Sequence, residues 1–179
     1  MLFFSKLKHI KAFVLDIDGV LTDATIHVTE SGEQLRRFNV RDGYAMQLAV
    51  KKGYPICVIS GGKSASVTLR LQGLGITDVH LGITKKLEIY NTFINQHQLQ
   101  PENVLYMGDD IPDLPVMKVA GLRTCPSDAV EEVKEISDYI SPNAGGYGCV
   151  RDVIEKVLKV QDNWFDGESN AQEDSIPSI

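Results

Sequence analysis

Short, almost wholly apolar runs alternate with longer amphipathic stretches along most of this chain, and this alternation strongly constrains its fold. The apolar runs lie at residues 11–15, 54–59, 79–81, 103–107 and 122–124. Runs this short and apolar are typical of strands that are buried on both faces. Residues 86–97, by contrast, place Leu87, Tyr90 and Ile94 at helical spacing. Strands and helices in alternation predict an α/β fold, with a parallel sheet flanked by helices.

One segment interrupts the alternation. Residues 25–28 and 34–38 flank the sequence Glu-Ser-Gly-Glu at 30–33, and this pattern predicts a β-hairpin. Asp42 is predicted to cap the following helix, which should run to about Lys52 and stop at Gly53. Residues 1–161 are therefore expected to form one domain. The polar residues 162–179 are expected to form a disordered tail.

Composition narrows the class of protein. The 179 residues carry a net charge of −6, which argues against nucleic acid or an anionic membrane as a partner. No apolar run has the length of a signal peptide or a membrane span, so we expect a cytoplasmic protein. Cys57, Cys125 and Cys149 form no zinc-like spacing and are expected to be reduced thiols.

Polar residues gather where the predicted strands meet the helices. In open parallel sheets, ligands bind beyond the carboxyl ends of the strands, so side chains at these junctions are expected to converge. The set comprises Asp16, Asp18, Ser60, Gly61, Lys86, Asp109 and Asp110.

The acidic members of this set suggest a metal-assisted reaction. Carboxylates crowded at one edge repel each other and require a cation or a shared proton. Asp16 and Asp109 suit Mg²⁺, a hard ion that takes few protein ligands and accepts substrate phosphate as another. One carboxylate can then attack phosphorus, while Asp18 exchanges protons with the leaving oxygen and with water.

The remaining members suit a phosphoryl group. The Ser60 hydroxyl, the Gly61 N–H and the Lys86 ammonium can all bind phosphoryl oxygens. Taken singly, each feature has a simpler explanation: a turn, a loop, a solvated lysine or, for Asp110, a helix cap. Those explanations do not account for the ordered set of four junctions.

The ordered set resembles the haloacid dehalogenase superfamily of phosphatases over about residues 10–160. The matching segments are the sequence DIDGVLTD at 16–23, Ser60-Gly61, Lys86 and the sequence GDDIPD at 108–113. The resemblance implies a Rossmann-like parallel sheet and a phospho-aspartate mechanism, with Asp16 as nucleophile and Asp18 as general acid/base. It implies that Mg²⁺ binds Asp16, the Asp18 main-chain carbonyl and Asp109, and that Ser60, Gly61 and Lys86 bind phosphate.

Two further segments resemble the 3-deoxy-D-manno-octulosonate 8-phosphate phosphatases: FNVRDGY at 38–44 and GGYGCVR at 145–151. This resemblance implies a homotetramer that supplies a sugar acid for lipopolysaccharide. It also implies a set of substrate-binding residues: Asp18, Asn39, Val40, Arg41, Asp42, Gly43, Arg70, Lys86 and Asp110.

The chain departs from that family at Gly62, where arginine is frequent, and at Cys149, where alanine is usual. Gly62 leaves the sugar open, so a nonulosonate 9-phosphate of the sialic-acid type is an alternative substrate. The spacing leaves room for a hairpin but no lid domain, and the resemblance implies that neighbouring subunits close the site. Arg151 either reaches across to such a neighbour or lies solvated at its helix start.

Three other readings are weighed against a phosphatase. A receiver-like signalling domain would carry its phosphorylated aspartate after the third strand, which this chain does not. A non-catalytic phosphate-binding regulator would not need the complete set of site residues. A phosphomutase needs a lid to exclude water from the phospho-aspartate, and no insert could supply one.

Overall fold

The computed structural model describes residues 3–164. A six-stranded parallel sheet lies at its centre, with the strand order β5-β4-β1-β6-β7-β8. The strands are β1 (Ala12–Leu15), β4 (Ile56–Ser60), β5 (Asp78–Leu81), β6 (Val104–Met107), β7 (Leu122–Cys125) and β8 (Tyr139–Ile140). The predicted α/β fold with a parallel sheet is therefore confirmed.

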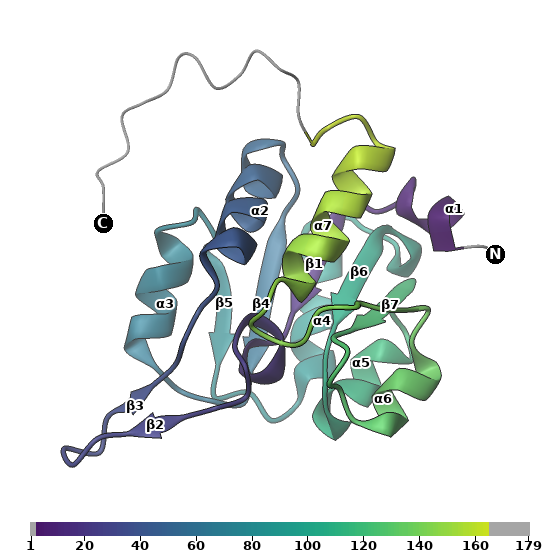
Figure 1. The fold of residues 1–179 in the computed structure, drawn as a ribbon. Coiled ribbons are helices and arrows are strands. Elements are labelled where there is room, and N and C mark those ends of the chain that lie inside the picture. The colour runs from purple at the N-terminus through teal and green to yellow at the C-terminus, as the bar shows by residue number, and fades with distance from the viewer. Residues whose placement is uncertain (1–2, 165–179) are drawn as a thin grey trace.

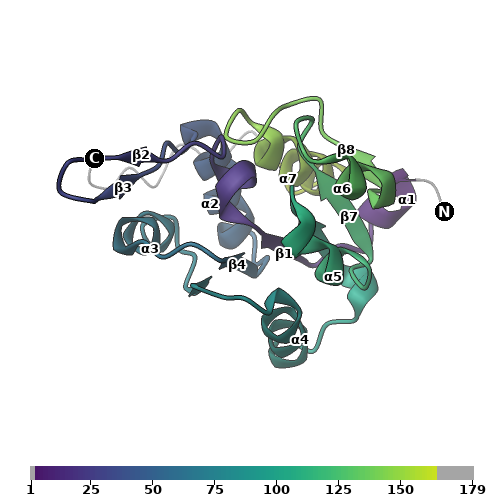
Figure 2. The ribbon, with the colours of Figure 1, turned by 90° about the horizontal axis from the view of Figure 1, so that it is seen from below.

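Helices cover both faces of the sheet (Figures 1 and 2). Alternate residues of β1 enter two different cores: Phe13 and Leu15 pack in one, Ala12 and Val14 in the other. The first core is closed by α1 (Phe3–Leu7), α2 (Val40–Lys51), α3 (Ala65–Gln72) and α7 (Cys149–Val160). The second is closed by α4 (Lys86–Gln96), α5 (Leu114–Met117) and α6 (Glu131–Ile136). A strand buried on both faces needs apolar residues at every position, which explains the uninterrupted runs.

A two-stranded hairpin, β2 (His27–Val28) and β3 (Gln34–Leu35), projects from the body of the molecule (Figure 1). It is shorter than the predicted strands at 25–28 and 34–38, because only two residue pairs form the ladder. Val28 is 67% exposed and Leu35 is 50% exposed. Between β1 and α2 the chain forms a tight turn at Ile17–Leu21 and then this hairpin.

The prediction that Asp42 caps α2 is wrong. The Asn39 side chain caps this helix by accepting a hydrogen bond from the Arg41 N–H at 2.8 Å. Asp42 lies inside the helix, buried, and accepts hydrogen bonds from the backbone N–H groups of Gly148 (3.2 Å) and Arg151 (2.6 Å). These amides belong to the first turn of α7, so Asp42 caps a different helix from the one that contains it.

Three further expectations concern the C-terminal tail, the cysteines and membrane-spanning helices. Of the expected tail at 162–179, residues 165–179 lie outside the described part. Trp164 packs edge-on against Tyr44, with ring centroids 6.3 Å apart. The three cysteines are buried and form no disulfide with one another. Among the described residues, no helix combines the length and apolarity needed to cross a membrane.

Candidate active site

The site begins where β1 ends. The Asp16 N–H still donates to the Met107 carbonyl at 3.1 Å, as in a continuing sheet, and the chain then turns tightly through Ile17–Leu21. Gly19 has a φ of 94°, and a Cβ there would lie 2.0 Å from Asp109 Oδ2. Only glycine permits both this conformation and this approach. The turn therefore brings the loop after β1 against the loop after β6.

Three carboxylates meet at this point: Asp16, Asp109 and Asp113 each offer an oxygen, and these oxygens lie within 4.8 Å of one another. Burial, together with the charge of Asp113, raises the pKa of Asp16 to about 7. Burial and the charges of Asp16 and Asp113 raise the pKa of Asp109 to about 8. Asp109 Oδ1 is buried and has no hydrogen-bond partner among the described residues. A cluster of hard oxygen donors that is costly to ionise alone fits Mg²⁺.

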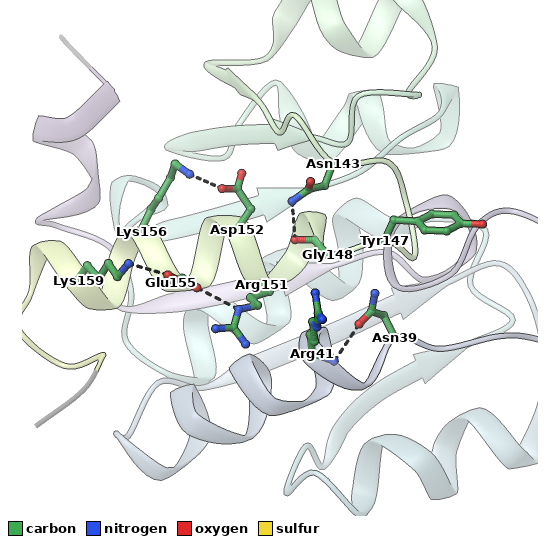
Figure 3. A pocket seen from close by; sticks show the side chains of 10 residues that line it. All are labelled: Asn39, Arg41, Asn143, Tyr147, Gly148, Arg151, Asp152, Glu155, Lys156 and Lys159. Atoms are coloured by element: carbon green, nitrogen blue, oxygen red, sulfur yellow. Dashed lines mark hydrogen bonds and ion pairs between the residues drawn. The ribbon is translucent and has the colours of Figure 1, made fainter. Parts of the chain in front are cut away.

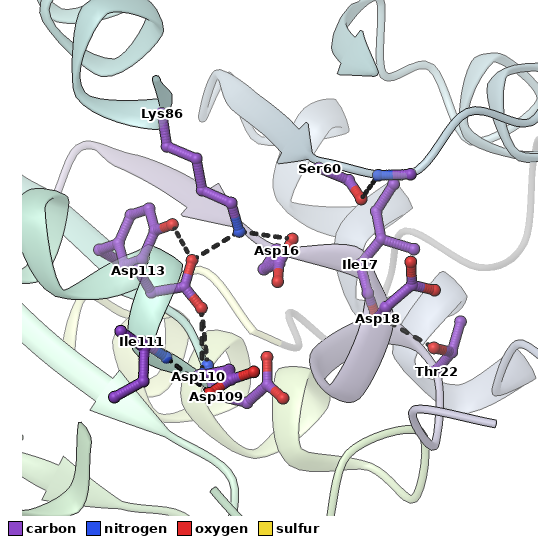
Figure 4. A network of polar contacts seen from close by, with 12 residues as sticks. Asp16, Ile17, Asp18, Thr22, Ser60, Lys86, Asp109, Asp110, Ile111 and Asp113 are labelled. Carbon is purple, nitrogen blue, oxygen red and sulfur yellow. Dashed lines mark hydrogen bonds and ion pairs between the residues drawn. The ribbon is translucent and has the colours of Figure 1, made fainter. Parts of the chain in front are cut away.

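Lys86 is the cation that the chain itself supplies (Figure 4). Its Nζ lies 2.7 Å from Asp113 Oδ1, and 2.9 Å from Asp16 Oδ1 in an ion pair without hydrogen-bond geometry. Burial lowers the pKa of Lys86, but the two carboxylates outweigh it and the net shift is upward. Lys86 therefore keeps its charge in a buried position at the start of α4.

Sequence reasoning assigned no role to Asp113, although the residue closes the GDDIPD segment. Its Oδ1 also accepts a hydrogen bond from the Tyr106 hydroxyl at 2.6 Å. Its Oδ2 accepts from the backbone N–H groups of Asp109 (2.9 Å) and Asp110 (3.3 Å). Asp113 thus holds both Lys86 and the loop after β6 in place. A third aspartate three residues beyond a Gly-Asp-Asp turn was the available signal.

A cavity of about 530 Å³ opens over these groups. Its lining includes the complete set predicted at the strand ends: Asp16, Asp18, Ser60, Gly61, Lys86, Asp109 and Asp110. Ser60 ends β4, and its Oγ accepts a hydrogen bond from the Gly62 N–H at 3.1 Å. The tertiary structure therefore brings together segments that lie as much as 94 residues apart in the sequence.

The other predicted substrate residues do not line this cavity in the single chain. Asn39 and Arg41 line a second cavity of about 500 Å³, between the start of α2 and α7 (Figure 3). Val40 is exposed, and Asp42 is occupied by α7. The predicted residues Gly43 and Arg70 pack together, since a Cβ at Gly43 would lie 2.7 Å from Arg70 Nη2.

The second cavity carries several cations. Arg41, Arg151, Lys156 and Lys159 all line it. Arg151 donates to Glu155 at 3.0 Å, and its guanidinium lies 5.1 Å from the centroid of the Trp164 ring. The reading of Arg151 as a solvated residue at a helix start is therefore incomplete, because its side chain is already engaged within the chain.

Sequence reasoning also missed Arg36. This arginine follows β3, yet its side chain is only 4% exposed and donates to the Asp18 carboxylate. It lies beside Gly62, the position at which the resemblance leads one to expect arginine. A guanidinium from the hairpin therefore approaches the space over Gly62.

Comparisons with known proteins agree with this geometry. A family model described as haloacid dehalogenase-like hydrolase matches residues 39–121. The 3-deoxy-D-manno-octulosonate 8-phosphate phosphatase KdsC of Escherichia coli strain K12 is 38% identical over 157 residues, which cover 88% of this chain and 84% of the relative.

Solved structures point the same way. The phosphatase of that name from Yersinia pestis has a TM-score of 0.88 at 34% identity, covering 90% of this chain and 87% of the other. The enzyme from Moraxella catarrhalis, crystallised with magnesium, phosphate and KDO, has a TM-score of 0.87 at 35% identity, covering 90% and 92%. The chain belongs to the haloacid dehalogenase-like hydrolases, and among them to the 3-deoxy-D-manno-octulosonate 8-phosphate phosphatases.

Proposed function

We propose that this protein is a Mg²⁺-dependent phosphatase that hydrolyses 3-deoxy-D-manno-octulosonate 8-phosphate to the free sugar acid and phosphate, a step toward lipopolysaccharide. The observation that carries the proposal is the buried group of Asp16, Asp109, Asp113 and Lys86 at one end of the cavity. It joins a carboxylate nucleophile, oxygen donors for a cation and a fixed positive charge.

The first half of the reaction transfers the phosphoryl group to the protein. A carboxylate oxygen of Asp16 attacks phosphorus, and the bond between phosphorus and the sugar oxygen breaks. Asp18 gives its proton to the departing oxygen, so the sugar leaves as an alcohol. Ser60, the Gly61 N–H and Lys86 line the same cavity and stabilise the charge on the phosphoryl oxygens.

The second half releases phosphate. Asp18, now ionised, takes a proton from a water molecule, whose oxygen attacks phosphorus while the bond to Asp16 breaks. Asp16, the Asp18 main-chain carbonyl and Asp109 would hold Mg²⁺, which would supply neutralising charge for a dianion entering an acidic site. Asp113 does not react and keeps Lys86 directed at Asp16.

The open cavity is closed by other subunits of a cytoplasmic homotetramer. A site without a lid cannot exclude water or surround a small sugar. The hairpin exposes Ile26, Val28 and Leu35, an apolar set that fits a subunit contact. Asn39, Arg41 and Arg151 line a cavity of their own, and they would reach substrate only across such a contact.

The test is phosphate release with Mg²⁺ from 3-deoxy-D-manno-octulosonate 8-phosphate beside a nonulosonate 9-phosphate, with Asp16→Asn as the blank. We expect a strong preference for the octulosonate, lost in the variant. Preference for the nonulosonate would keep the mechanism and change the substrate. Release of phosphate from neither substrate, or equal release by the variant, would contradict the phosphatase activity and favour a non-catalytic regulator.

A further inference from the structure

Arg36 donates hydrogen bonds of unequal length to the two carboxylate oxygens of Asp18, the proposed acid/base. Arg36 Nε donates to Asp18 Oδ1 at 2.6 Å, whereas Nη2 donates to Asp18 Oδ2 at 3.3 Å. The first is a short charge-assisted hydrogen bond, and the second is long and weak. Oδ1 is therefore held firmly, and Oδ2 remains available.

The burial of Arg36 is unusual for its position. The neighbouring hairpin residues Gln34, Leu35 and Arg37 are exposed, but the Arg36 side chain is only 4% exposed. Its Nη1 is buried and has no hydrogen-bond partner in the part of the chain that the structure describes. Burying a guanidinium with an unused donor costs free energy. Within residues 3–164, its one ion pair is with the 31%-exposed side chain of Asp18, and this contact offsets part of the cost of burying the guanidinium.

Gly62 makes this arrangement possible. A Cβ at position 62 would lie 3.0 Å from Arg36 Nη2, 3.0 Å from Asp18 Oδ2 and 3.5 Å from Ser60 Oγ. The first two distances are tighter than ordinary carbon contacts, so even alanine would press on both members of the ion pair. The contact of Arg36 with Asp18 therefore depends on the absence of a side chain at position 62.

We infer that Arg36 is a positioning residue for the acid/base step: it fixes Asp18 through Oδ1 and leaves Oδ2 as the oxygen that exchanges the proton. This inference rests on the proposed function, in which Asp18 protonates the leaving oxygen. A rigid hold on one oxygen sets the direction of the other, and proton transfer depends strongly on that direction. Arg36 reaches Oδ2 only through the long 3.3 Å contact of Nη2, and it acts on the substrate through Asp18.

The dependence of rate on the leaving group tests this role. Basic sugar or phenol oxygens need a proton as they leave, whereas dinitrophenolate does not. The ratio kcat/KM reports phosphoryl transfer to Asp16 and not the later hydrolysis, in which Asp18 acts as base on every substrate. We expect Arg36→Met to lower kcat/KM by about 10²-fold for the sugar-acid phosphate and for phenyl phosphate. For dinitrophenyl phosphate we expect kcat/KM to change less than about threefold, since general acid catalysis is not required in that transfer. Arg36→Lys should restore part of the loss.

Two further variants control the result. Arg37→Met removes the adjacent arginine, which pairs with Asp23 outside the site, and should keep the wild-type dependence on the leaving group. Gly62→Ala should reproduce the Arg36→Met pattern without altering the arginine, even if Arg36→Met itself fails to fold.

The outcomes separate the two proposals. An equal loss of kcat/KM on every substrate, no loss of kcat/KM, or the same pattern in Arg37→Met would overturn the positioning role while leaving the phosphatase intact. If the wild-type protein releases no phosphate with Mg²⁺, that result would instead contradict the proposed function itself.

Discussion

The Asp42 carboxylate accepts a hydrogen bond from the Arg151 backbone N–H at 2.6 Å, and this contact joins the first turn of α2 to the first turn of α7. The two helices pack side by side over the same face of the sheet (Figure 1). A buried acid inside one helix thus satisfies the free amides of another.

Replacing Asp42 should destabilise the fold. Asp42→Ala leaves two partly buried N–H groups without their partner, and the free energy of unfolding should fall by about 1–3 kcal/mol. Urea denaturation measures the change. Asp128→Ala is the control, because Asp128 is exposed and accepts from one amide, that of Gly145. An equal loss of stability in the two variants would show that the Asp42 cap on α7 contributes no more than the single hydrogen bond that Asp128 accepts.

Lys86 should matter to turnover far more than its neighbour. Lys86→Met removes the charge held between Asp16 and Asp113, so kcat should fall by about 10²–10³-fold. Lys85→Met is the matched control, since Lys85 is exposed and pairs with Glu88 at 3.0 Å. Steady-state phosphate release compares them. Similar losses in the two variants would contradict the assignment of Lys86 to the phosphoryl group.

Tyr106 should support activity indirectly. Its hydroxyl donates to Asp113 at 2.6 Å, deep in the core. Tyr106→Phe keeps the ring and removes this bond, so kcat should fall modestly, by about tenfold. Asp113→Asn should cost more, because it weakens the hold on Lys86 as well. If Tyr106→Phe proves the more damaging change, the hydroxyl has a role beyond holding Asp113.

Magnesium should stabilise the protein more at high pH. Burial raises the pKa of Asp16 to about 7 and that of Asp109 to about 8, against 3.8 ordinarily. The metal-free folded state retains protons that the unfolded chain has lost. This contribution to stability is present below about pH 4 and disappears as the pH rises through about 7 to 8.

Thermal melting with EDTA or Mg²⁺ tests this dependence. We expect the metal-free Tm to fall between about pH 6 and pH 9, and the increase in Tm on adding Mg²⁺ to be larger at pH 9. Asp109→Asn should lose most of both effects. An increase in Tm that is the same at both pH values would show that these carboxylates are not the ones that bind the metal.

The hairpin should control assembly. Val28→Asp places a charge on a side chain that is 67% exposed in the single chain, where it costs little unless a subunit covers it. We expect a smaller species by light scattering and weaker activity. Val119→Asp is the control, because Val119 is also exposed but lies next to α5. An unchanged molar mass for Val28→Asp would show that the hairpin does not form part of a subunit interface.

Much of the fold, and the convergence of the predicted site residues on one cavity, was predictable from the sequence. Strands buried on both faces must be apolar throughout, so β1, β4 and β6 stand out as short runs such as Phe13–Leu15. Parallel strands end at one edge, so Asp16, Ser60 and Asp109 had to converge once those strands were recognised. Local pattern and topology sufficed for these conclusions.

Only the tertiary structure decided the partners of long and buried side chains. Asp42 is placed by sequence at a helix start, but the approach of α7 determines which amides it accepts. Arg36 reads as one more hairpin cation, and its contact with Asp18 depends on a hairpin turning back over Gly62. Periodicity fixes which way a side chain leaves its own strand or helix, whereas its partners depend on packing between distant segments.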